Sequence, residues 1–279
     1  MSSISCISGV ILTKNEVSNL RQCIASLQWC QEVIVVDSGS TDQTIQLAES
    51  LGAKVFINIL PPPFKISEQR NWALQNCNIK NQWVLFLDAD ETIPTHLAIE
   101  IQSVCSKNDN PYNAFELTPR YLFWGKWLKR TQGYPNWHSR LVKKGEVTFA
   151  GGVWEHFAEG AKAGRISIPY DHFANSKGLS DWIERHNRYS SWDAQNVVNF
   201  LETKKVSAFG SERKLSLRLL AAKFWLLRPI ARFLYMYIFR LGFLEGWQSF
   251  IFCLLHAMYE FMIVVKIIEF KRIKSGFDL

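Results

Sequence analysis

Acidic side chains follow two of the apolar segments in the first hundred residues. Asp37 comes directly after the apolar stretch 32–36, and Asp88 and Asp90 follow the stretch 83–87. Two carboxylates at that spacing in an extended chain point to one side and repel each other, so a divalent cation between them is favourable. Oxygen ligands suit Mg²⁺ or Mn²⁺, and such ions commonly bind phosphate oxygens as well. The spacing therefore predicts a divalent-cation site that handles a phosphorylated ligand.

Strand-like and helix-like patterns alternate up to about residue 111. We expect strands at 7–12, 32–36, 54–59 and 83–87, and helices at about 43–51, 67–75 and 180–200. This alternation predicts parallel βαβ units with a buried sheet. Ligands of such open sheets bind at the carboxyl ends of the strands. The acidic residues named above are expected to lie at that edge.

Three early segments resemble family 2 glycosyltransferases of the GT-A fold. They are 13–16 (Thr-Lys-Asn-Glu), 36–42 (Val-Asp-Ser-Gly-Ser-Thr-Asp) and 88–91 (Asp-Ala-Asp-Glu), and the segment 69–74 also fits. More narrowly, 179–185 and 242–247 resemble the lipopolysaccharide core β-glucosyltransferase group. The resemblance covers nearly the whole chain. It implies a Rossmann-like α/β domain that binds a nucleotide-diphosphate sugar.

The resemblance also implies a nucleotide pocket. Thr13, Asn15 and Glu16 are expected to line it. Asp37 is expected to contact the base or the ribose, and Arg70 to lie near the base or the diphosphate.

The metal site is the second implied feature. Asp88 and Asp90 are expected to hold the ribose and the metal–diphosphate group. His172 resembles a histidine that follows the last core strand of GT-A enzymes and is the candidate third metal ligand. The expected cofactor is Mg²⁺ or Mn²⁺.

An inverting transfer needs a carboxylate that takes the proton of the acceptor hydroxyl. The best candidate is Glu155, in a segment similar to the Val-His-Glu of the family, although Trp154 stands here in place of that histidine. Glu91 is the alternative base. The predicted catalytic residues are Glu155, as the base, and Asp90, at the metal–diphosphate group.

Aromatic and basic side chains gather between residues 120 and 140. Arg120 and Arg140 are expected to contact the phosphate or the acceptor, and Trp124 and Trp137 to stack on sugar rings. An aromatic packing region beside a membrane is the alternative interpretation.

Basic charge is confined to the last quarter of the chain. From Lys204 onward there are 13 Lys and Arg against 5 Asp and Glu, whereas the whole chain carries a net charge of +7. Bases among long apolar runs favour an anionic membrane surface over nucleic acid, which we do not expect as a partner. We expect a linker at 204–216 and interfacial helices over 217–268. A spanning segment at 246–268 or a helical homodimer interface is the alternative.

The sequence thus predicts a GT-A domain over 1–203 and a membrane-associating helical region over 204–279. The first divides into a nucleotide-binding part, 1–111, and an acceptor-side part, 112–203. The six cysteines form no C-x-x-C pair, and the N-terminus does not resemble a signal peptide, so we expect the cytoplasmic face of a membrane.

The predicted function is transfer of a hexose to a glycolipid or lipopolysaccharide-core-type acceptor. The resemblance favours glucose as the sugar and UDP as the nucleotide. One alternative is a haloacid-dehalogenase-type phosphatase, because 88–92 also matches D-x-D-x-T, in which the first Asp is a nucleophile. Another is a non-catalytic membrane scaffold with a GT-A shape.

Overall fold

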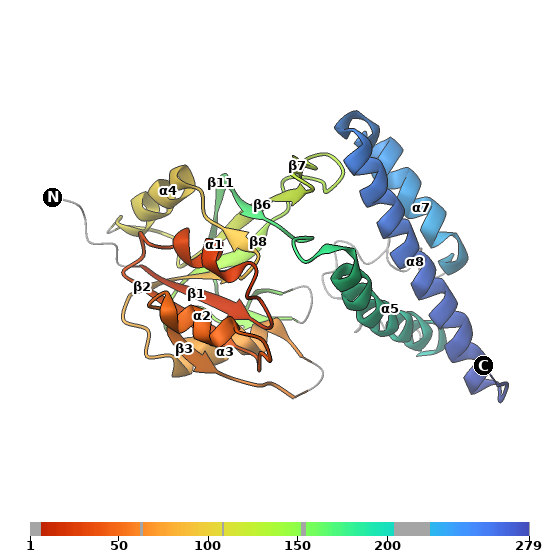
Figure 1. Ribbon diagram of the computed structural model, residues 1–279, viewed down its shortest axis with the longest axis horizontal. Helices are drawn as coiled ribbons and strands as arrows, with labels where there is room; N and C mark the ends of the chain where they lie inside the picture. Colours follow the sequence, from red (N-terminus) through yellow and green to blue (C-terminus); the bar gives the residue numbers. More distant parts are fainter. Residues whose placement is uncertain (1–6, 62–63, 108, 152–154, 204–223, 279) are drawn as a thin grey trace. The chain divides into compact units, whose positions relative to one another are not determined.

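The computed structural model of the chain describes residues 7–61, 64–107, 109–151, 155–203 and 224–278 (Figure 1). These residues form two compact units, which are described one at a time. The first holds residues up to 122 together with 134–176, and the second holds 123–133 together with 177 onward. The functional division at residue 203 that the sequence suggests remains a prediction.

The first unit is an α/β unit. Its strands are β1 (Ile7–Thr13), β2 (Glu32–Asp37), β3 (Lys54–Ile57), β4 (Trp83–Asp88), β5 (Glu91–Thr92), β6 (Ala114–Phe123), β8 (His138–Lys143), β9 (Phe149–Ala150), β10 (His156–Phe157) and β11 (Ala163–His172). Its helices are α1 (Leu20–Ala25), α2 (Thr44–Ser50), α3 (Ile66–Asn76) and α4 (Thr95–Cys105). The main sheet has the order β3-β2-β1-β4-β8-β6-β11-β5, and β9 pairs separately with β10.

Parallel pairing brings the carboxyl ends of three strands together. Strand β1 pairs in parallel with β2 on one side and β4 on the other, so Thr13 lies beside Asp37 and Leu12 beside Asp88. Strand β8 then pairs antiparallel with both β4 and β6. The edge where β1, β2 and β4 end is where open parallel sheets bind ligands.

The predicted α/β class is confirmed, and the four expected strands are present. The strands β1, β2 and β4 each extend one residue further than expected, which places Thr13, Asp37 and Asp88 inside the strands. The helices expected at 43–51 and 67–75 correspond to α2 and α3.

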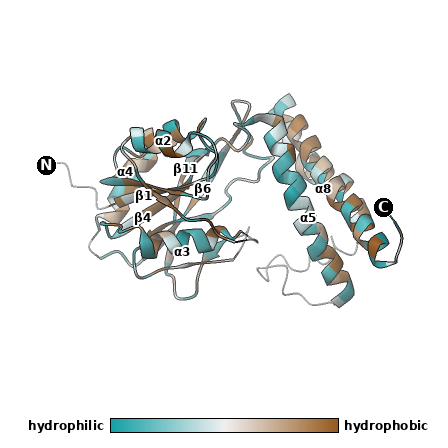
Figure 2. Ribbon diagram, turned by 60° about the horizontal axis from the view of Figure 1, so that its bottom comes forward, coloured by the Kyte–Doolittle hydropathy of each residue, from teal (hydrophilic) through white to brown (hydrophobic). Residues whose placement is uncertain are grey.

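Alternating side chains divide the core between the two faces of the sheet. In β4, Leu85 and Leu87 pack in the cluster that contains α1 and α4, whereas Val84 and Phe86 pack in the cluster that contains α3. Figure 2 shows α4 on one side of the sheet and α3 on the other. A strand covered on both faces has no solvent side, which explains why the segment 83–87 is continuously apolar.

The second unit is mainly helical. It contains β7 (Lys126–Trp127), α5 (Gly178–Thr203), α7 (Arg228–Leu234), α8 (Trp247–Lys274) and the short helical turns η3 (Trp225–Leu227), η4 (Tyr235–Phe239) and η5 (Gly242–Glu245). Helix α5 packs on α8 through Ala194, Val197, Val198, Ile263 and Ile267. The helix expected at 180–200 is therefore present as α5, and the structure groups it with α8. The expected linker at 204–216 lies outside the described residues.

Helix α8 is the most apolar long element of this unit. Among the helices that the structure describes, it alone has the length and composition to cross a membrane. The prediction of an apolar helical region at the C-terminal end of the chain is confirmed to this extent.

Candidate active site

A polar loop organised around Asp37 follows β2. The Oδ1 atom of Asp37 accepts the backbone N–H groups of Gly39 and Ser40 at 2.9 and 2.7 Å. Its Oδ2 atom accepts the hydroxyls of Thr13 at 2.8 Å and Ser40 at 2.5 Å. Gly39 has a φ of 85°, a left-handed conformation that glycine adopts without a Cβ clash. The carboxylate is completely buried, so in this structure it fixes the shape of the loop.

Asn15 and Glu16 lie on the loop after β1, which is hydrogen-bonded to the loop after β2. The Oδ1 atom of Asn15 accepts a hydrogen bond from the backbone N–H of Thr41 at 2.7 Å. The backbone N–H of Asn15 donates to Ser40 Oγ at 2.7 Å. The carboxylate of Glu16 accepts the side-chain amide of Asn19 at 2.8 Å. The two loops thus form one continuous polar edge, and its contact with a nucleotide remains a prediction.

Two buried arginines face the carboxylate of Asp88 at the end of β4. Nη2 of Arg70, from α3, lies 3.3 Å from Oδ1, and Nη2 of Arg140, from β8, lies 3.0 Å from Oδ2. Burial opposes ionisation of this carboxyl, but the guanidinium groups of Arg140 and Arg70 hold its pKa well below the usual range. Asp88 is therefore a carboxylate paired with arginines.

Glu155 is held by the same two arginines. Its Oε1 atom contacts Nη1 of Arg70 and lies 3.5 Å from Nη1 of Arg140. Its Oε2 atom is buried and accepts no hydrogen bond from any residue in the described ranges. Burial raises the pKa of Glu155, although the two arginines oppose that effect. This carboxylate is consequently a stronger proton acceptor than an exposed glutamate.

Glu91 completes an arginine-held network, which consists of Asp88, Glu91, Glu155, Arg70 and Arg140. Its Oε1 atom accepts Nη2 of Arg140 at 2.5 Å, and its Oε2 atom accepts the backbone N–H of Asp88 at 3.0 Å. Burial raises the pKa of Glu91 to about 7, against the opposing effect of Arg140. Three carboxylates share two guanidinium groups here, so a proton on Glu91 relieves an excess of negative charge.

Asp90 and His172 lie side by side next to this network. The antiparallel pairing of β5 with β11 sets His172 opposite Glu91. Nε2 of His172 is 3.5 Å from Oδ2 of Asp90, and its Nδ1 is 3.8 Å from Oε1 of Glu91. Burial lowers the pKa of His172, but the Asp90 and Glu91 carboxylates outweigh it and raise that pKa. A carboxylate beside an imidazole is a ligand pair that a divalent cation accepts.

The three predicted metal ligands are therefore divided between two environments. Asp90 and His172 approach each other, whereas both oxygens of Asp88 face arginines. Within the described parts of the chain, no group of three or more His, Cys, Asp and Glu side chains gathers around a possible metal position. Two protein ligands leave coordination positions for phosphate oxygens and water, which Mg²⁺ usually keeps. The pair suits a cation that arrives with its substrate.

The predicted acceptor residues lie at separate places. Arg140 belongs to the arginine-held network. Arg120 makes a two-point contact with Asp171 of the adjacent strand β11, with Nη2 donating to Oδ2 at 2.8 Å. The guanidinium group of Arg165 lies 4.9 Å from the ring centroid of Trp137. Trp124 is half-exposed and belongs to the second unit. The acceptor roles of Arg120, Trp124, Trp137 and Arg140 remain predictions.

His138 and Tyr170 adjoin the network and were not expected from the sequence. The Tyr170 hydroxyl is 2.8 Å from Nδ1 of His138 and 3.5 Å from Nη2 of Arg140. Burial lowers the pKa of His138 and raises the pKa of Tyr170, so both side chains are neutral at pH 7. A sequence signal existed, because His138 and Arg140 stand two residues apart on a strand and share one face.

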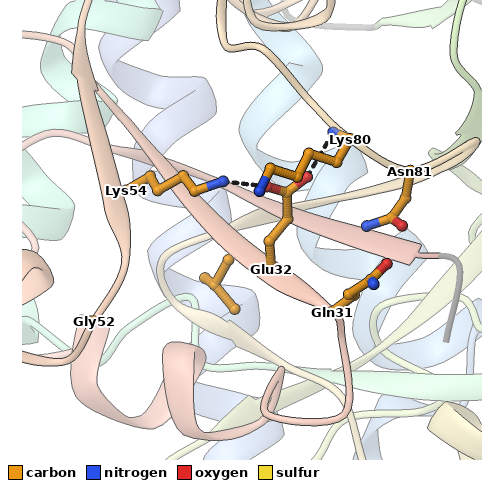
Figure 3. Close-up of a pocket in the computed structure, with 7 residues that line it drawn as sticks. Gln31, Glu32, Gly52, Lys54, Lys80 and Asn81 are labelled. Atoms are coloured by element: carbon orange, nitrogen blue, oxygen red, sulfur yellow. Dashed lines mark hydrogen bonds and ion pairs between the residues drawn. The ribbon is translucent and has the colours of Figure 1, made fainter. Parts of the chain in front are cut away.

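A hollow lies at the opposite, amino end of the strands (Figure 3). It is lined by Gln31, Glu32, Val33, Gly52, Lys54, Lys80 and Asn81. The carboxylate of Glu32 accepts Nζ of Lys54 at 2.5 Å and the backbone N–H of Lys80 at 2.7 Å. The carboxylate of Glu32 therefore has hydrogen-bond partners within the protein. The hollow is separate from the network at the carboxyl ends of the strands.

Comparison with known proteins identifies the family. The family described as Glycosyl transferase family 2 matches residues 8–165. An uncharacterized glycosyltransferase of Rickettsia felis is 30% identical over 94% of this chain and 89% of its own length. The lipopolysaccharide core biosynthesis glycosyltransferase LpsC of Rhizobium meliloti is 33% identical over 37% of this chain and 38% of its own length. The crystal structure of glucosyl-3-phosphoglycerate synthase from Mycobacterium tuberculosis with Mn²⁺ and UDP-glucose is 25% identical, with a TM-score of 0.34, over 41% of this chain and 43% of that one.

The family match contains the strand ends of β1, β2 and β4 and the whole arginine-held network. It overturns the phosphatase alternative. In the structure Asp88 ends β4, and both of its oxygens are engaged by arginines, so it lacks the environment of a nucleophile. The scaffold alternative is likewise not retained. The resemblance is confirmed, and the chain belongs to glycosyl transferase family 2 as a glycosyltransferase.

Proposed function

We propose that the chain transfers a hexose from a nucleotide-diphosphate sugar to a membrane glycolipid. The observation that carries the proposal is the buried carboxylate of Glu155, which has one oxygen without a partner and lies beside the strand ends of the family match. UDP and glucose are the nucleotide and sugar that the motif resemblance favours. Similarity to LpsC supports an acceptor of the lipopolysaccharide-core type.

Glu155 is the proposed general base. Arg70 and Arg140 hold its Oε1 atom, which leaves Oε2 to receive the proton of the acceptor hydroxyl. The hydroxyl oxygen attacks the anomeric carbon as it loses this proton. The raised pKa of Glu155 favours this proton transfer. Glu91 is less suited to the role, because both of its oxygens already accept hydrogen bonds. Attack opposite the leaving diphosphate inverts the anomeric centre.

Asp90 and His172 are the proposed protein ligands of a divalent cation. When bound, this cation neutralises the charge of the leaving nucleotide diphosphate. Asp88, oriented by Arg70 and Arg140, is then assigned to the ribose side of the donor. Nε of each arginine is buried and makes no hydrogen bond to a described residue, so each has an unused donor.

The cytoplasmic face of a membrane is the proposed location. The described cysteines, Cys23, Cys30, Cys77, Cys105 and Cys253, are free thiols, which suits a reducing compartment. A glycolipid acceptor and an apolar C-terminal helix both favour a position at the membrane.

Thermal-shift screening tests the donor. Apparent stability rises with ligand occupancy of the folded state, so sugars linked to UDP, GDP, CDP and dTDP are compared with Mn²⁺ and with chelator. We expect the largest rise in Tm with a UDP-sugar and Mn²⁺. Absence of a response to every nucleotide sugar would contradict the proposal.

A matched pair of variants tests the cation site. Asp90→Asn should abolish transfer and the Mn²⁺-dependent part of nucleotide binding, while Asp109→Asn, at an exposed position, should match the unchanged chain. Near-normal turnover of Asp90→Asn with Mn²⁺ would refute the assignment. Inversion is checked separately, because NMR of the first product must show the anomeric configuration opposite to that of the donor.

A further inference from the structure

Helix α8 carries an unbroken line of exposed apolar side chains. The line, called here the α8 stripe, consists of Trp247, Phe250, Leu254, Met258, Phe261, Val265 and Ile268. These residues recur every three or four positions, so they share one face of the helix. Further exposed apolar side chains lie on the neighbouring segment around α7: Leu227, Ile230, Leu234 and Ile238. An exposed apolar stripe of this kind indicates an interaction site.

The charged residues in the middle of α8 do not interrupt the stripe, because their partners lie within the unit. Glu260 is buried and accepts hydrogen bonds from Arg228 at 2.7 Å and Arg232 at 2.9 Å. Lys266 donates to the hydroxyl of Ser191 on α5 at 2.7 Å. Glu260 is thus neutralised by arginines, and Lys266 keeps its charge but is hydrogen-bonded to α5, so neither side chain belongs to the exposed stripe.

Helix α5 opposes a transmembrane position for α8. The contacts of α5 extend along α8 from His256 to Lys274, which donates to Glu202 at 2.7 Å. Those 18 steps correspond to about 27 Å, close to the hydrocarbon thickness of a bilayer. Figure 2 shows α5 as mostly hydrophilic beside the more hydrophobic α8, and its Glu184 and Arg188 are well exposed. If α8 crossed the membrane, these charges would lie at bilayer depth, which is expensive.

We propose that the α8 stripe docks on an anionic lipid bilayer, with α8 lying in the plane of the interface. Lys271 and Arg272 follow the stripe at the exposed end of the helix, and their charge complements anionic headgroups. Trp247 at the other end is a residue type that favours the membrane interface. This geometry concerns the membrane alone, and it stands whether or not the sugar acceptor is a lipid.

A second copy of the chain fits this surface less well than lipid does. Helices that pair as a coiled coil use a narrow apolar stripe flanked by charged residues that set partner and register. Here Leu255 and Met262 lie beside the stripe, and the acidic residue nearest to it, Glu269, comes close to its C-terminal end. A broad and mostly uncharged face specifies little register, and a fluid bilayer surface requires none.

Flotation of the full chain with vesicles tests the docking face. We expect binding to vesicles of phosphatidylglycerol and phosphatidylethanolamine, and weaker binding to phosphatidylcholine alone. Leu254→Glu and Phe261→Glu should each lower partitioning by about tenfold or more, as expected for a large apolar side chain that no longer enters lipid. Trp192→Glu is the matched control, because Trp192 is equally exposed but shares a face of α5 with Glu184 and Arg188.

Two results of the flotation experiment would overturn the proposal. One is unchanged flotation of both stripe variants. The other is a dimer that becomes monomeric in the stripe variants while flotation stays the same, which would assign the face to a second copy. Unchanged unfolding midpoints and nucleotide binding of the variants show that they are folded, so a loss of flotation reports the surface itself.

Protease accessibility tests the in-plane orientation. The chain is synthesised in the presence of sealed anionic vesicles with an epitope and a protease site added after Leu279. An in-plane α8 leaves the epitope on the same side as the first unit, so added protease removes it without detergent. Protection of the epitope until detergent is added, with the first unit accessible, would show a spanning helix and refute the inference.

Discussion

Two strands that flank β1 in the sheet each end in an aspartate, and the two carboxylates are held by different means. At the end of β2, Asp37 accepts four hydrogen bonds from hydroxyl and backbone N–H groups of its own loop and of Thr13. At the end of β4, Asp88 is paired with two guanidinium groups from α3 and β8. The donors to Asp37 are all neutral, and they use all of its acceptor positions. The donors to Asp88 are positively charged.

The difference separates a residue that shapes the pocket from residues that can react. All acceptors of Asp37 are used, whereas the network around Asp88 retains Glu155 Oε2 and Nε of both arginines without partners among the described residues. Buried polar atoms without partners are costly, and a ligand that supplies the missing contacts recovers that energy. We therefore expect variants of the arginine-held network to affect catalysis and stability more than variants of the Asp37 loop.

The largest effect is expected from removing the proposed base. Glu155→Gln keeps the shape of the side chain and abolishes proton acceptance, so kcat should fall roughly 10²–10⁴-fold with nucleotide affinity nearly unchanged. The control is Glu116→Gln, whose carboxylate lies in an ion pair with Arg165. Steady-state transfer rates and a separate measurement of nucleotide binding distinguish the two effects. A loss of nucleotide affinity with normal kcat would make Glu155 a pocket residue and pass the base role to Glu91.

The second effect concerns stability. Arg140→Met removes the common partner of the Asp88, Glu91 and Glu155 carboxylates. It should lower the free energy of unfolding by about 3–5 kcal/mol, the usual cost of breaking a buried ion pair such as that of Arg140 with Glu91. Arg120→Met should cost at most about 1 kcal/mol, because the guanidinium of Arg120 is 35% exposed and screened by solvent. Urea unfolding of both variants gives the comparison. If both variants lose the same free energy of unfolding, burial does not determine how much Arg140 contributes to stability.

Much of the first unit could be predicted from sequence, because local patterns determine it. The apolar run 83–87 ends in Asp88 where the strand leaves the core, so both the strand and the position of its acidic end follow from period and composition. Asp37 at the end of β2 was predicted on the same grounds. Glu155 was found by its likeness to a family segment, and its grouping with the network is visible only in the structure.

The arginine partners were harder to predict, because they come from distant parts of the chain. Arg70 belongs to α3 and Arg140 to β8, and no local pattern indicates that both reach Asp88. Arg140 was expected to contact the phosphate or the acceptor, and that role remains a prediction. The antiparallel pairing of β8 with β4 brings it to the acidic end, and this pairing depends on the order of strands in the sheet.

The third effect concerns pH and Glu91. Its pKa in the folded chain is about 7, above its ordinary value of 4.5. Because the folded value is the higher one, the stability that Glu91 contributes is fully present below about pH 4.5 and is lost as the pH rises through 7. Glu91→Gln cannot titrate, so relative to it the unchanged chain should lose unfolding free energy between these pH values. Denaturant unfolding in chelator checks this, and a pH-independent difference would contradict it.

The smallest effect is expected at the end of β2, where the aspartate is held by neutral donors. Asp37→Asn keeps Oδ1, which accepts the N–H groups of Gly39 and Ser40, but it replaces Oδ2 by a group that cannot accept the hydroxyls of Thr13 and Ser40. The free energy of unfolding should fall by about 1–3 kcal/mol, the cost of unsatisfied buried polar groups. Thr13→Val removes one hydroxyl from the same contact and should cost less.

The same variant distinguishes pocket shape from cation binding. Since Asp37 shapes the loop that is predicted to receive the nucleotide, Asp37→Asn should weaken nucleotide binding equally with Mn²⁺ and with chelator. Asp90→Asn should weaken it only when Mn²⁺ is present. Titration of a nucleotide sugar into both variants under both conditions separates the two. If the affinity loss of Asp37→Asn appears only with Mn²⁺, the loop after β2 belongs to the cation site, and the contrast between the two strand ends fails.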